Sequence, residues 1–263
     1  MTIGMITDFG ENDYFVGTLK GVIRRISPQA DIIDICHGVP SYFIPGGSYV
    51  LEKTWRFFPA GTVFLVVVDP GVGTQRKLLL ATAGGCSFVA PDNGILTPIF
   101  TQGRDVVVRE LDQERFFLIS GSSTFEARDR MAPVAAHLAK GTSAAEVGSE
   151  TSEYVVNPDY HPRLASPGLA EGRIIWVDKF GNIITNVPGK WLFETLGAGG
   201  FKNFVLRLNE REIGEYRQNY ASASGQPFLL VGSHGNLEVA MNRRHAFREL
   251  KAALYQKLTI LFS

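Results

Sequence analysis

The sequence has few cysteines and no excess charge of either sign. Only Cys36 and Cys86 occur among its 263 residues, and neither belongs to a CxxC pair, which argues against a disulfide framework and a thiolate zinc site. Its 26 lysines and arginines balance 26 aspartates and glutamates, so the chain has no electrostatic footprint for nucleic acid or an anionic membrane. The five histidines show no HExxH or other metal-ligand spacing, and we therefore predict no metal.

Long hydrophobic runs are also absent. No apolar run reaches the roughly 18 residues that a membrane-spanning helix needs. The first residues, MTIGMITDFG, lack the basic segment and the cleavage site of a signal peptide. The hydrophobic fraction of 45% and the charged fraction of 20% exclude a disordered or collagen-like chain. These features predict a soluble, cytoplasmic protein with a sizeable core and one or two domains.

The first half of the chain alternates between two patterns. Short apolar runs predict strands, and apolar residues spaced by three and four predict helices. Asp13 is a plausible N-cap for the first helix. The expected strands are 2–7, 30–36, 62–68, 78–83, 86–90 and 105–110, and the expected helices follow Asp13 and lie at 46–58 and 131–139. Strands that alternate with helices predict an α/β domain with a mainly parallel sheet.

The pattern changes near residue 157. The stretch NPDYHPRLASPGLAEG holds three prolines and little periodicity, so residues 158–171 are interpreted as a linker. Short strands are expected beyond it, at 172–177, 182–186, 203–208, 228–231, 237–241 and 258–262. We therefore predict an α/β N-terminal domain at 1–157 and a small all-β, barrel-like C-terminal domain at 172–263.

Polar residues follow the buried strands of the first half. Asp8 follows the first strand, and Asp69 leads from strand 62–68 into a glycine-rich turn that ends near Arg76. Ligands of open α/β sheets bind beyond the carboxyl ends of the strands, where a carboxylate can hold a vicinal diol such as a ribose. The alternatives are a plain turn at Asp8 and a structural ion pair between Asp69 and Arg76. The turn is not a Walker A loop, because no Lys-Ser/Thr follows its glycines.

Other candidate side chains have equally plain structural explanations. The PDNG segment with Asn93 is a turn signal, and the Arg and Asp of TFEARD could merely cap the next helix. DKFGN, which contains Asp178, is first of all a hairpin turn, although its acid, aromatic and amide side chains would also suit an amino group and a purine. His234 is more often a surface histidine than a ligand.

In chain order the motifs form one pattern. They are TDFG, KGVI, the His37 loop, VVDPGVGTxR, APDNGxLTP, TFxxRDxxAPVAAHLA, VDxFGNxITN and GxLEVAxN. Together they closely resemble the S-adenosylmethionine (SAM) hydroxide adenosyltransferase family, the adenosine-forming SAM hydrolases, which are relatives of fluorinase and chlorinase. The resemblance runs from Thr7 to Asn242. It implies the two-domain architecture described above and the reaction of SAM with water to give adenosine and methionine, without a cofactor. It also implies a homotrimer in which SAM binds between the N-terminal domain of one subunit and the C-terminal domain of the next.

The resemblance also implies roles for individual residues. Asp8 resembles the carboxylate on the ribose diol, and Asp13 and Asp178 resemble partners of the methionine ammonium. Ser233 and His234 resemble the clamp on the methionine carboxylate, although relatives have Arg in place of His234. The remaining expected substrate contacts are Phe180 and Asn182 at the adenine, Tyr42 against the nucleoside, Asn93, and Thr124 and Phe125 on the nucleophile side.

The expected catalytic residues are Asp69, Arg76 and Glu126. A sulfonium is already a good leaving group, so the demand is an oxygen nucleophile held in line with C5′ and stripped of bulk water. Asp69 can accept a hydrogen bond from that water, and Arg76 can stabilise its developing hydroxide character. The halogenating relatives have Tyr in place of Asp69 and a small hydroxyl residue in place of Val72. A carboxylate would repel a halide, so Asp69 favours water.

Glu126 departs from the family pattern, in which this position is His. A glutamate there would place two carboxylates beside one guanidinium, and we hypothesise that it hydrogen-bonds either the water or Arg76. The plain alternative is that Glu126 points to solvent. A competing function is therefore a SAM- or adenosine-binding protein with little turnover. A SAM-dependent halogenase or methyltransferase is less favoured, and the latter would need a Gly-rich loop where TDFGEND stands.

Overall fold

The structure is a computed structural model that describes residues 1–118, 123–197, 204–220 and 225–262. The chain divides into two compact units, Met1–Asn157 and Pro158–Ser263. Each unit builds its own sheet and its own hydrophobic core. Within the described ranges, no helix is long and apolar enough to cross a membrane.

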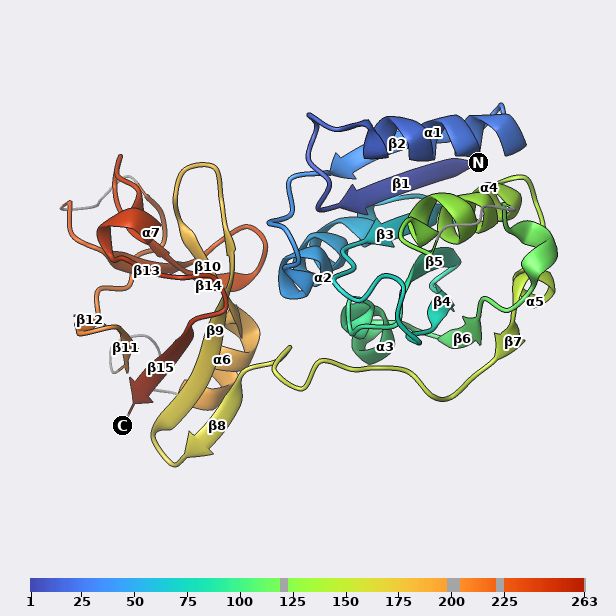
Figure 1. Cartoon of the computed structure of the whole chain (residues 1–263). Coiled ribbons are helices and arrows are strands. Elements are labelled where there is room, and N and C mark those ends of the chain that lie inside the picture. The colour runs from blue at the N-terminus through green and yellow to red at the C-terminus, as the bar shows by residue number, and fades with distance from the viewer. Residues whose placement is uncertain (119–122, 198–203, 221–224, 263) are drawn as a thin grey trace. The chain divides into compact units, whose positions relative to one another are not determined.

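The first unit is built on a seven-stranded sheet (Figure 1). Its strands are β1 (Thr2–Thr7), β2 (Asp31–Cys36), β3 (Val63–Val67), β4 (Leu78–Ala83), β5 (Cys86–Pro91), β6 (Val107–Glu110) and β7 (Ser149–Glu150). The spatial order is β2-β1-β3-β5-β4-β6-β7. Neighbours from β2 to β5 run parallel, and the pairs beyond β5 are antiparallel. The predicted α/β class with a mostly parallel sheet is confirmed.

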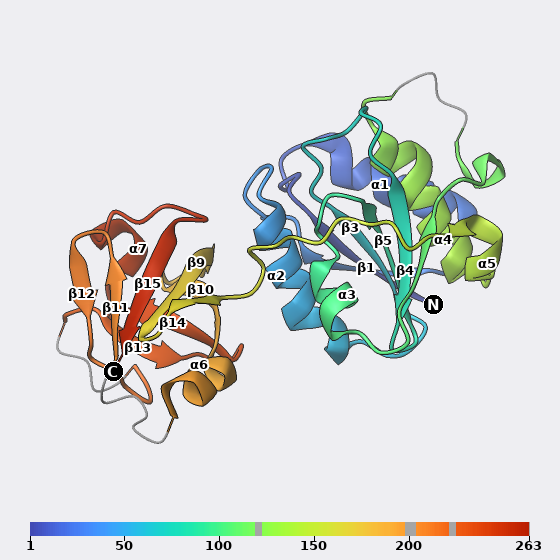
Figure 2. The same ribbon diagram turned by 90° about the horizontal axis from the view of Figure 1, so that it is seen from below.

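Helices cover both faces of this sheet. The helices are α1 (Tyr14–Ile26), α2 (Ile44–Thr54), α3 (Thr97–Gln102), α4 (Ala132–Ala139) and α5 (Ala144–Val147), with short turns η1 (Trp55–Phe57), η2 (Glu114–Phe116) and the π-helical η3 (Ala127–Met131). Helices α1 and α4 lie together on one face, and α2 and α3 lie together on the other (Figures 1 and 2).

Helix α1 shows how the sequence builds this packing. The carboxylate of Asp13 accepts the backbone N–H of Tyr14 at 2.7 Å, so Asp13 is the predicted N-cap. Leu19 and Ile23, one turn apart, are fully buried in the core that α1 shares with α4. The apolar stripe of the helix therefore faces the sheet, as its spacing predicts.

The second unit is a barrel-like antiparallel sheet. Its strands are β8 (Arg163–Ser166), β9 (Leu169–Val177), β10 (Ile183–Pro188), β11 (Phe204–Leu208), β12 (Arg211–Ile213), β13 (Phe228–Val231), β14 (Asn236–Ala240) and β15 (Lys257–Phe262), with helices α6 (Gly189–Leu196) and α7 (Ala246–Glu249). The order is β12-β11-β15-β9-β10-β14-β13, with β8 added onto β9. The predicted all-β, barrel-like class is confirmed, and Asn203, where one strand was predicted to start, lies outside the described residues.

The segment 158–171 is more than the linker that its prolines suggested. Strand β8 and the start of β9 lie within it, joined by the two residues Pro167 and Gly168. Gly168 has φ +77°, which the second central position of a tight turn requires after proline. The prolines therefore mark a hairpin turn in addition to a connection.

Candidate active site

A cavity of about 340 Å³ in the first unit lies where β1 and β3 end. Because β1 pairs with β2 on one side and with β3 on the other, the chain order reverses between β1 and β3. Ligands of open α/β sheets bind at such a switch point. The cavity is lined by Asp8, Phe9, Phe15, Ser41, Tyr42, Val67, Asp69, Val72, Thr124, Phe125, Glu126 and Ala127. Six predicted site residues, Asp8, Tyr42, Asp69, Thr124, Phe125 and Glu126, are thus brought together.

The turn after β3 folds Arg76 back onto Asp69. Thr74 Oγ1 donates to the carbonyl of Gly71 at 2.7 Å, and Gly73 adopts φ +80°, a conformation that favours glycine. Arg76 Nε donates to Asp69 Oδ1 at 2.7 Å, and Arg76 Nη2 donates to Asp69 Oδ2. This two-point contact is the strong, planar form of an Arg–carboxylate pair.

Glu126 joins the same guanidinium from 50 residues away. Arg76 Nη2 donates to Glu126 Oε2 at 2.6 Å, and Arg130 Nη1 lies 3.1 Å from Glu126 Oε1. The side chains of Asp69, Arg76 and Glu126 are only 7–8% exposed. The predicted contact between Glu126 and Arg76 is therefore present, and Glu126 does not point to solvent.

The charges in this cluster balance, with two carboxylates and two guanidiniums. Burial by itself would lower the pKa of Arg76, but the hydrogen bonds and charges of Asp69 and Glu126 outweigh it, so its pKa is raised and it stays charged. Arg76 Nη1 is buried and has no hydrogen-bond partner in the part of the chain that the structure describes. An unsatisfied buried donor costs about 1–3 kcal/mol, and Arg76 itself does not line the cavity.

The π-helical turn η3 positions Glu126 at the cavity. Glu126 immediately precedes η3 (Ala127–Met131), which runs directly into α4, the helix predicted at 131–139. Such turns are rare and often occur at functional sites. Arg130 is four residues beyond Glu126, on the same side of the turn.

Asp8 also lines the cavity. Its Oδ2 accepts the backbone N–H of Tyr42 at 2.8 Å. Burial is the main cause that raises the pKa of Asp8 above 3.8, and the hydrogen bond from Tyr42 opposes the shift. Tyr42 has φ +65°, which is uncommon outside glycine, and its side chain is mostly exposed at the cavity. The strained backbone at Tyr42 is thus held by Asp8 itself.

Two predicted site residues of this unit, Asn93 and Asp13, make hydrogen bonds within the framework and lie outside the lining of this cavity. The amide of Asn93 donates to the carbonyl of Val68 at 2.9 Å and accepts the N–H of Ile95 at 3.2 Å, and Asn93 does not line the cavity. Asn93 follows β5, and its bond to Val68 ties it to the chain just after β3, at the residue that precedes Asp69. Asp13 caps α1 and likewise does not line the cavity.

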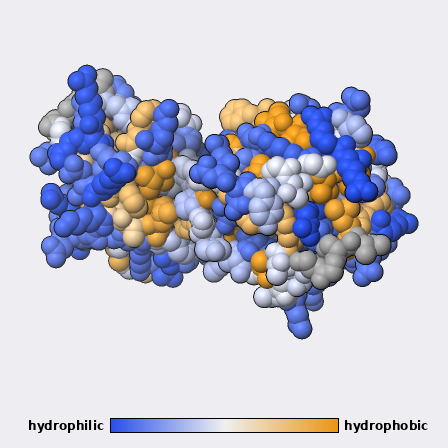
Figure 3. All heavy atoms as spheres, turned by 45° about the horizontal axis from the view of Figure 1, so that its top comes forward, coloured by the Kyte–Doolittle hydropathy of each residue, from blue (hydrophilic) through white to orange (hydrophobic). Residues whose placement is uncertain are grey.

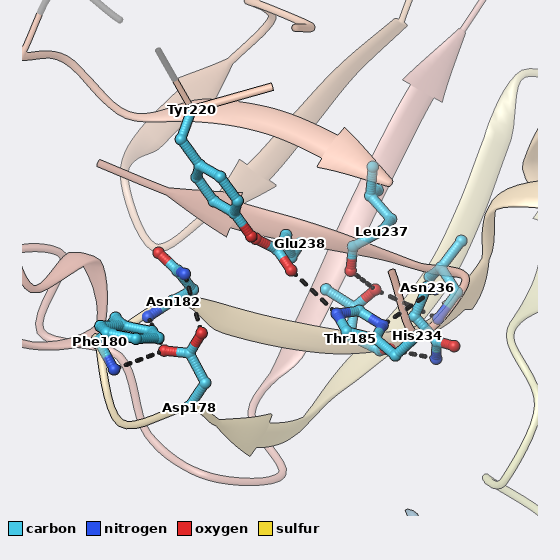
Figure 4. Close-up of polar contacts among 10 residues, drawn as sticks. Asp178, Phe180, Asn182, Thr185, Tyr220, His234, Asn236, Leu237 and Glu238 are labelled. Carbon is cyan, nitrogen blue, oxygen red and sulfur yellow. Dashed lines mark hydrogen bonds and ion pairs between the residues drawn. The ribbon is translucent and has the colours of Figure 1, made fainter. Parts of the chain in front are cut away.

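In the second unit, Asp178, Phe180 and Asn182 share the turn between β9 and β10 (Figure 4). Asp178 Oδ1 accepts the N–H groups of Phe180 and Asn182, each at 2.9 Å, and Oδ2 accepts the Asn182 amide at 2.9 Å. The carboxylate therefore organises the hairpin, as the plain reading of DKFGN expects. Phe180 is 68% exposed at the tip of the turn, while Asn182 is buried.

His234 lies in the turn between β13 and β14, and both of its ring nitrogens have partners (Figure 4). Nδ1 accepts the N–H of Asn236 at 3.1 Å, so Nε2 carries the proton that meets Glu238 Oε2 at 2.9 Å. Tyr220 donates to the other oxygen of the buried Glu238. Burial and this contact raise the pKa of Tyr220, which keeps the phenol protonated. Ser233, next to His234, is exposed.

Two family models together match most of the chain. The SAM hydroxide adenosyltransferase N-terminal domain matches residues 3–148, and the SAM hydroxide adenosyltransferase C-terminal domain matches residues 172–259. The chain belongs to the SAM hydroxide adenosyltransferase family. The two models fall on the two units that the structure separates.

Individual relatives of this SAM hydroxide adenosyltransferase agree with that assignment. The chain is 36% identical to an (R)-S-adenosyl-L-methionine hydrolase from Salinispora arenicola, over 91% of this chain and 90% of the relative. It is 28% identical to a fluorinase from an Actinoplanes species, with the same coverage. It also resembles a crystal structure of an uncharacterized conserved protein from Thermotoga maritima, with a TM-score of 0.87 and 35% identity, over 98% of this chain and 99% of that one.

Sequence reasoning missed several members of this adenosyltransferase site. Phe9, Phe15, Ser41 and Val67 line the cavity and were not predicted as site residues, although Phe9 and Val67 lie in the TDFG and VVDPGVGTxR motifs. Arg130 could have been found from its spacing of four residues to Glu126. The contact of Glu238 with Tyr220 could not, because the two residues come from separate strand and loop segments.

Proposed function

We propose that this chain hydrolyses SAM to adenosine and methionine by attack of a water oxygen on C5′ of the ribose. The observation that carries the proposal is the buried Asp69–Arg76–Glu126 cluster, whose two carboxylates line the same cavity as Asp8. The cavity thus combines a diol-binding carboxylate with groups that can hold and deprotonate water. The family of the chain and the printed names of its relatives, SAM hydrolases and fluorinases, support the same reaction.

In the proposed step, the oxygen of the water forms a bond to C5′ as the C5′–sulfur bond breaks. The bonding electron pair goes to sulfur, which turns the sulfonium into the neutral thioether of methionine. The proton of the water passes to a carboxylate of the cluster and then to solvent. Each oxygen of Asp69 has a lone pair left beyond its single bond from Arg76, so it can accept the water without releasing the guanidinium.

The two carboxylates also argue against a halide as the nucleophile. An anion placed beside Asp69 and Glu126 would face two like charges that Arg76 and Arg130 only just balance. A water, in contrast, can donate to either carboxylate, because both line the cavity. The same cavity that favours water therefore disfavours fluoride and chloride.

The remaining substrate contacts belong to the proposal as well. We infer that Asp8 binds the ribose diol, that Tyr42 packs on the nucleoside, and that Thr124 and Phe125 face the nucleophile. In the second unit, the exposed Phe180 and the amide of Asn182 would receive the adenine, and Asp178 would approach the ammonium. Asp13, Asn93, Ser233 and His234 stay predictions as substrate contacts, and the bonds of His234 to Asn236 and Glu238 leave neither ring nitrogen free for a carboxylate.

We propose that the protein is a homotrimer whose sites take groups from the first unit of one subunit and the second unit of another. Supporting this, Tyr42 and Phe180, both expected substrate contacts, belong to different units and are 73% and 68% exposed. Figure 3 shows hydrophobic residues gathered in patches among hydrophilic ones on both units. Light scattering of the active enzyme should give three times the chain mass, and a monomer mass would contradict the proposal.

We expect SAM binding to weaken on acidification. The pH at which it weakens should be higher than the pH at which an aspartate of ordinary pKa is protonated. Ionised Asp8 must accept the ribose hydroxyls, and burial raises its pKa above 3.8. As pH falls through this raised pKa, KM for SAM should rise, and Asp8→Asn should raise KM about 10–100-fold and flatten this dependence. A raised folded-state pKa makes Asp8 favour the folded state as pH falls, so unfolding through Asp8 is not the cause. Steady-state kinetics at several pH values, with melting curves as the control, test this.

Glu126 decides how fast the reaction runs. If Glu126 assists the water, Glu126→Gln should lower kcat with KM nearly constant, because the residue faces the nucleophile. Because Glu126 stands where the family pattern has histidine, we also expect Glu126→His to raise kcat. General-base assistance is worth about 10²–10⁴-fold, which bounds either effect. An unchanged kcat of Glu126→Gln between about pH 6 and pH 9 would show that the Asp69–Arg76 pair suffices.

The second candidate function is a SAM- or adenosine-binding protein with little turnover. It is favoured by one observation, namely that both oxygens of Glu126 are already engaged by Arg76 and Arg130. Tight SAM binding by calorimetry, with no adenosine after prolonged incubation, would support it. Formation of S-adenosylhomocysteine instead would indicate a methyltransferase.

A further inference from the structure

A chain of hydrogen bonds joins four side chains, those of Thr7, His37, Asp34 and Lys20, none of which lines the cavity. Thr7 Oγ1 lies 2.9 Å from His37 Nδ1, and His37 Nε2 lies 3.0 Å from Asp34 Oδ1. Asp34 Oδ2 accepts from Lys20 of α1 at 2.6 Å. Thr7 is fully buried and the His37 side chain is 5% exposed, whereas Asp34 and Lys20 are at the surface.

The chemistry of Asp34 fixes the orientation of this chain. A carboxylate only accepts, so Nε2 of His37 must carry a proton and donate to Asp34. In the neutral ring, Nδ1 is then an acceptor, and the hydroxyl of Thr7 donates to it. The groups that face the ring are thus Thr7 of β1 and Asp34 of β2, with Lys20 of α1 behind Asp34.

The same two residues fasten the loop that carries Asp8. Thr7 Oγ1 accepts the N–H of Phe9 at 3.2 Å, and the carbonyl of His37 accepts the N–H of Gly10 at 2.8 Å. Gly10 has φ +68°, so the loop turns sharply at this point. The two backbone N–H groups that follow Asp8 are therefore both fixed, that of Phe9 by Thr7, which contacts the His37 ring, and that of Gly10 by the His37 carbonyl.

His37 also begins the loop that carries Tyr42. Tyr42 lies five residues beyond His37, and its N–H donates to Asp8 Oδ2 at 2.8 Å. The ends of β1 and β2 are thereby joined twice, once through the His37 ring and once through the Asp8 carboxylate. The His37 ring therefore reaches Asp8 through Thr7, and the His37 backbone reaches the same loop through Gly10.

We propose that His37 is a positioning residue that sets the Asp8 carboxylate for the ribose diol through Thr7 and the Phe9–Gly10 backbone. This inference rests on the proposed function, in which Asp8 binds the two ribose hydroxyls. His37 does not line the cavity. Its effect is therefore on recognition of the ribose, not on the nucleophile.

Two substitutions separate the two bonds of the ring. The Asn side chain in His37→Asn can place a polar atom near Nδ1 and keep the bond to Thr7. The Gln side chain in His37→Gln reaches toward Nε2 and keeps the bond to Asp34 instead. Thr7→Val removes only the hydroxyl from an otherwise similar shape, and Lys20→Met is the matched control, because it breaks only the exposed outer pair.

The experiment compares kcat/KM for SAM with kcat/KM for its 2′-deoxyadenosyl analogue, which lacks one hydroxyl of the diol. We expect the wild type to prefer SAM by about tenfold or more, because a hydrogen bond to a charged group is lost. His37→Gln and Thr7→Val should lose most of this preference, while His37→Asn and Lys20→Met keep it. Purely structural damage would lower kcat/KM equally for both substrates and leave the ratio of the two values unchanged.

The outcomes distinguish this inference from the function on which it rests. A wild type without any preference for SAM would overturn the role of Asp8, and with it both proposals. A wild type that prefers SAM, together with His37→Gln and Thr7→Val variants that keep the full preference, would overturn the role of His37 alone. If His37→Gln fails to fold by its melting curve, Thr7→Val decides.

Discussion

We expect Asp69→Asn to lower kcat by about 10²–10⁴-fold while KM for SAM stays nearly constant. Asp69 lines the cavity and is the carboxylate that Arg76 holds at two points, so it is the best-oriented acceptor for the attacking water. Asparagine keeps the shape but cannot take up the proton. Because the proposal places Asp69 at the nucleophile and not at the leaving methionine, the loss should fall on the chemical step.

Steady-state kinetics measures the loss of kcat, and calorimetry with SAM measures the binding affinity separately. Asparagine turns an N–H group toward Arg76 Nη2, so the melting temperature of the variant must be recorded beside its kinetics. Asp112→Asn, at an exposed carboxylate that does not line the cavity, is the matched control and should leave kcat unchanged. An Asp69→Asn variant with full kcat would remove Asp69 from the mechanism.

Arg76→Met should lower the free energy of unfolding by about 3–5 kcal/mol, the largest stability effect that we expect. Methionine fills much of the volume but removes the cation between Asp69 and Glu126, both of which are buried. Two uncompensated carboxylates then face each other, and only Arg130 remains beside Glu126. Since acid protonates a carboxylate and relieves the repulsion, the loss should be smaller at low pH than at neutral pH.

Denaturant unfolding of Arg76→Met and Arg130→Met at two pH values tests this account. Arg130 also contacts Glu126, but its side chain is 49% exposed, so solvent screens the pair and the loss should be below about 1 kcal/mol. Equal losses in the two variants would mean that the Asp69–Arg76–Glu126 cluster is no more than an ordinary surface ion pair.

Local patterns in the sequence were sufficient for the framework of the fold. Each of these patterns lies within one short segment of the chain. Examples are the apolar spacing of α1, its cap at Asp13 and the continuous apolar run of β3. The hairpin at Pro167 and Gly168 was missed, because three prolines in one stretch also describe a linker. Proline alone does not say whether the strands on either side of it will pair.

The site was predictable where neighbours in space are neighbours in sequence. The pair Asp69–Arg76 follows from a short glycine-rich turn, and Asp8 follows from its place at the end of a buried strand. The bond of Arg76 to Glu126 spans 50 residues, and here the sequence offered only a hypothesis. The Thr7–His37 bond spans 30 residues and was not foreseen, because it depends on how β1 and β2 pair.

The central claim is that water is the nucleophile at C5′ of SAM. Incubation of the enzyme with SAM in water enriched in heavy oxygen, followed by mass spectrometry of the products, tests it directly. We expect one heavy oxygen in the 5′-hydroxyl of adenosine and none in methionine, with or without added chloride or fluoride. Unlabelled adenosine, a 5′-halogenated nucleoside, or no cleavage of SAM at all would contradict the account.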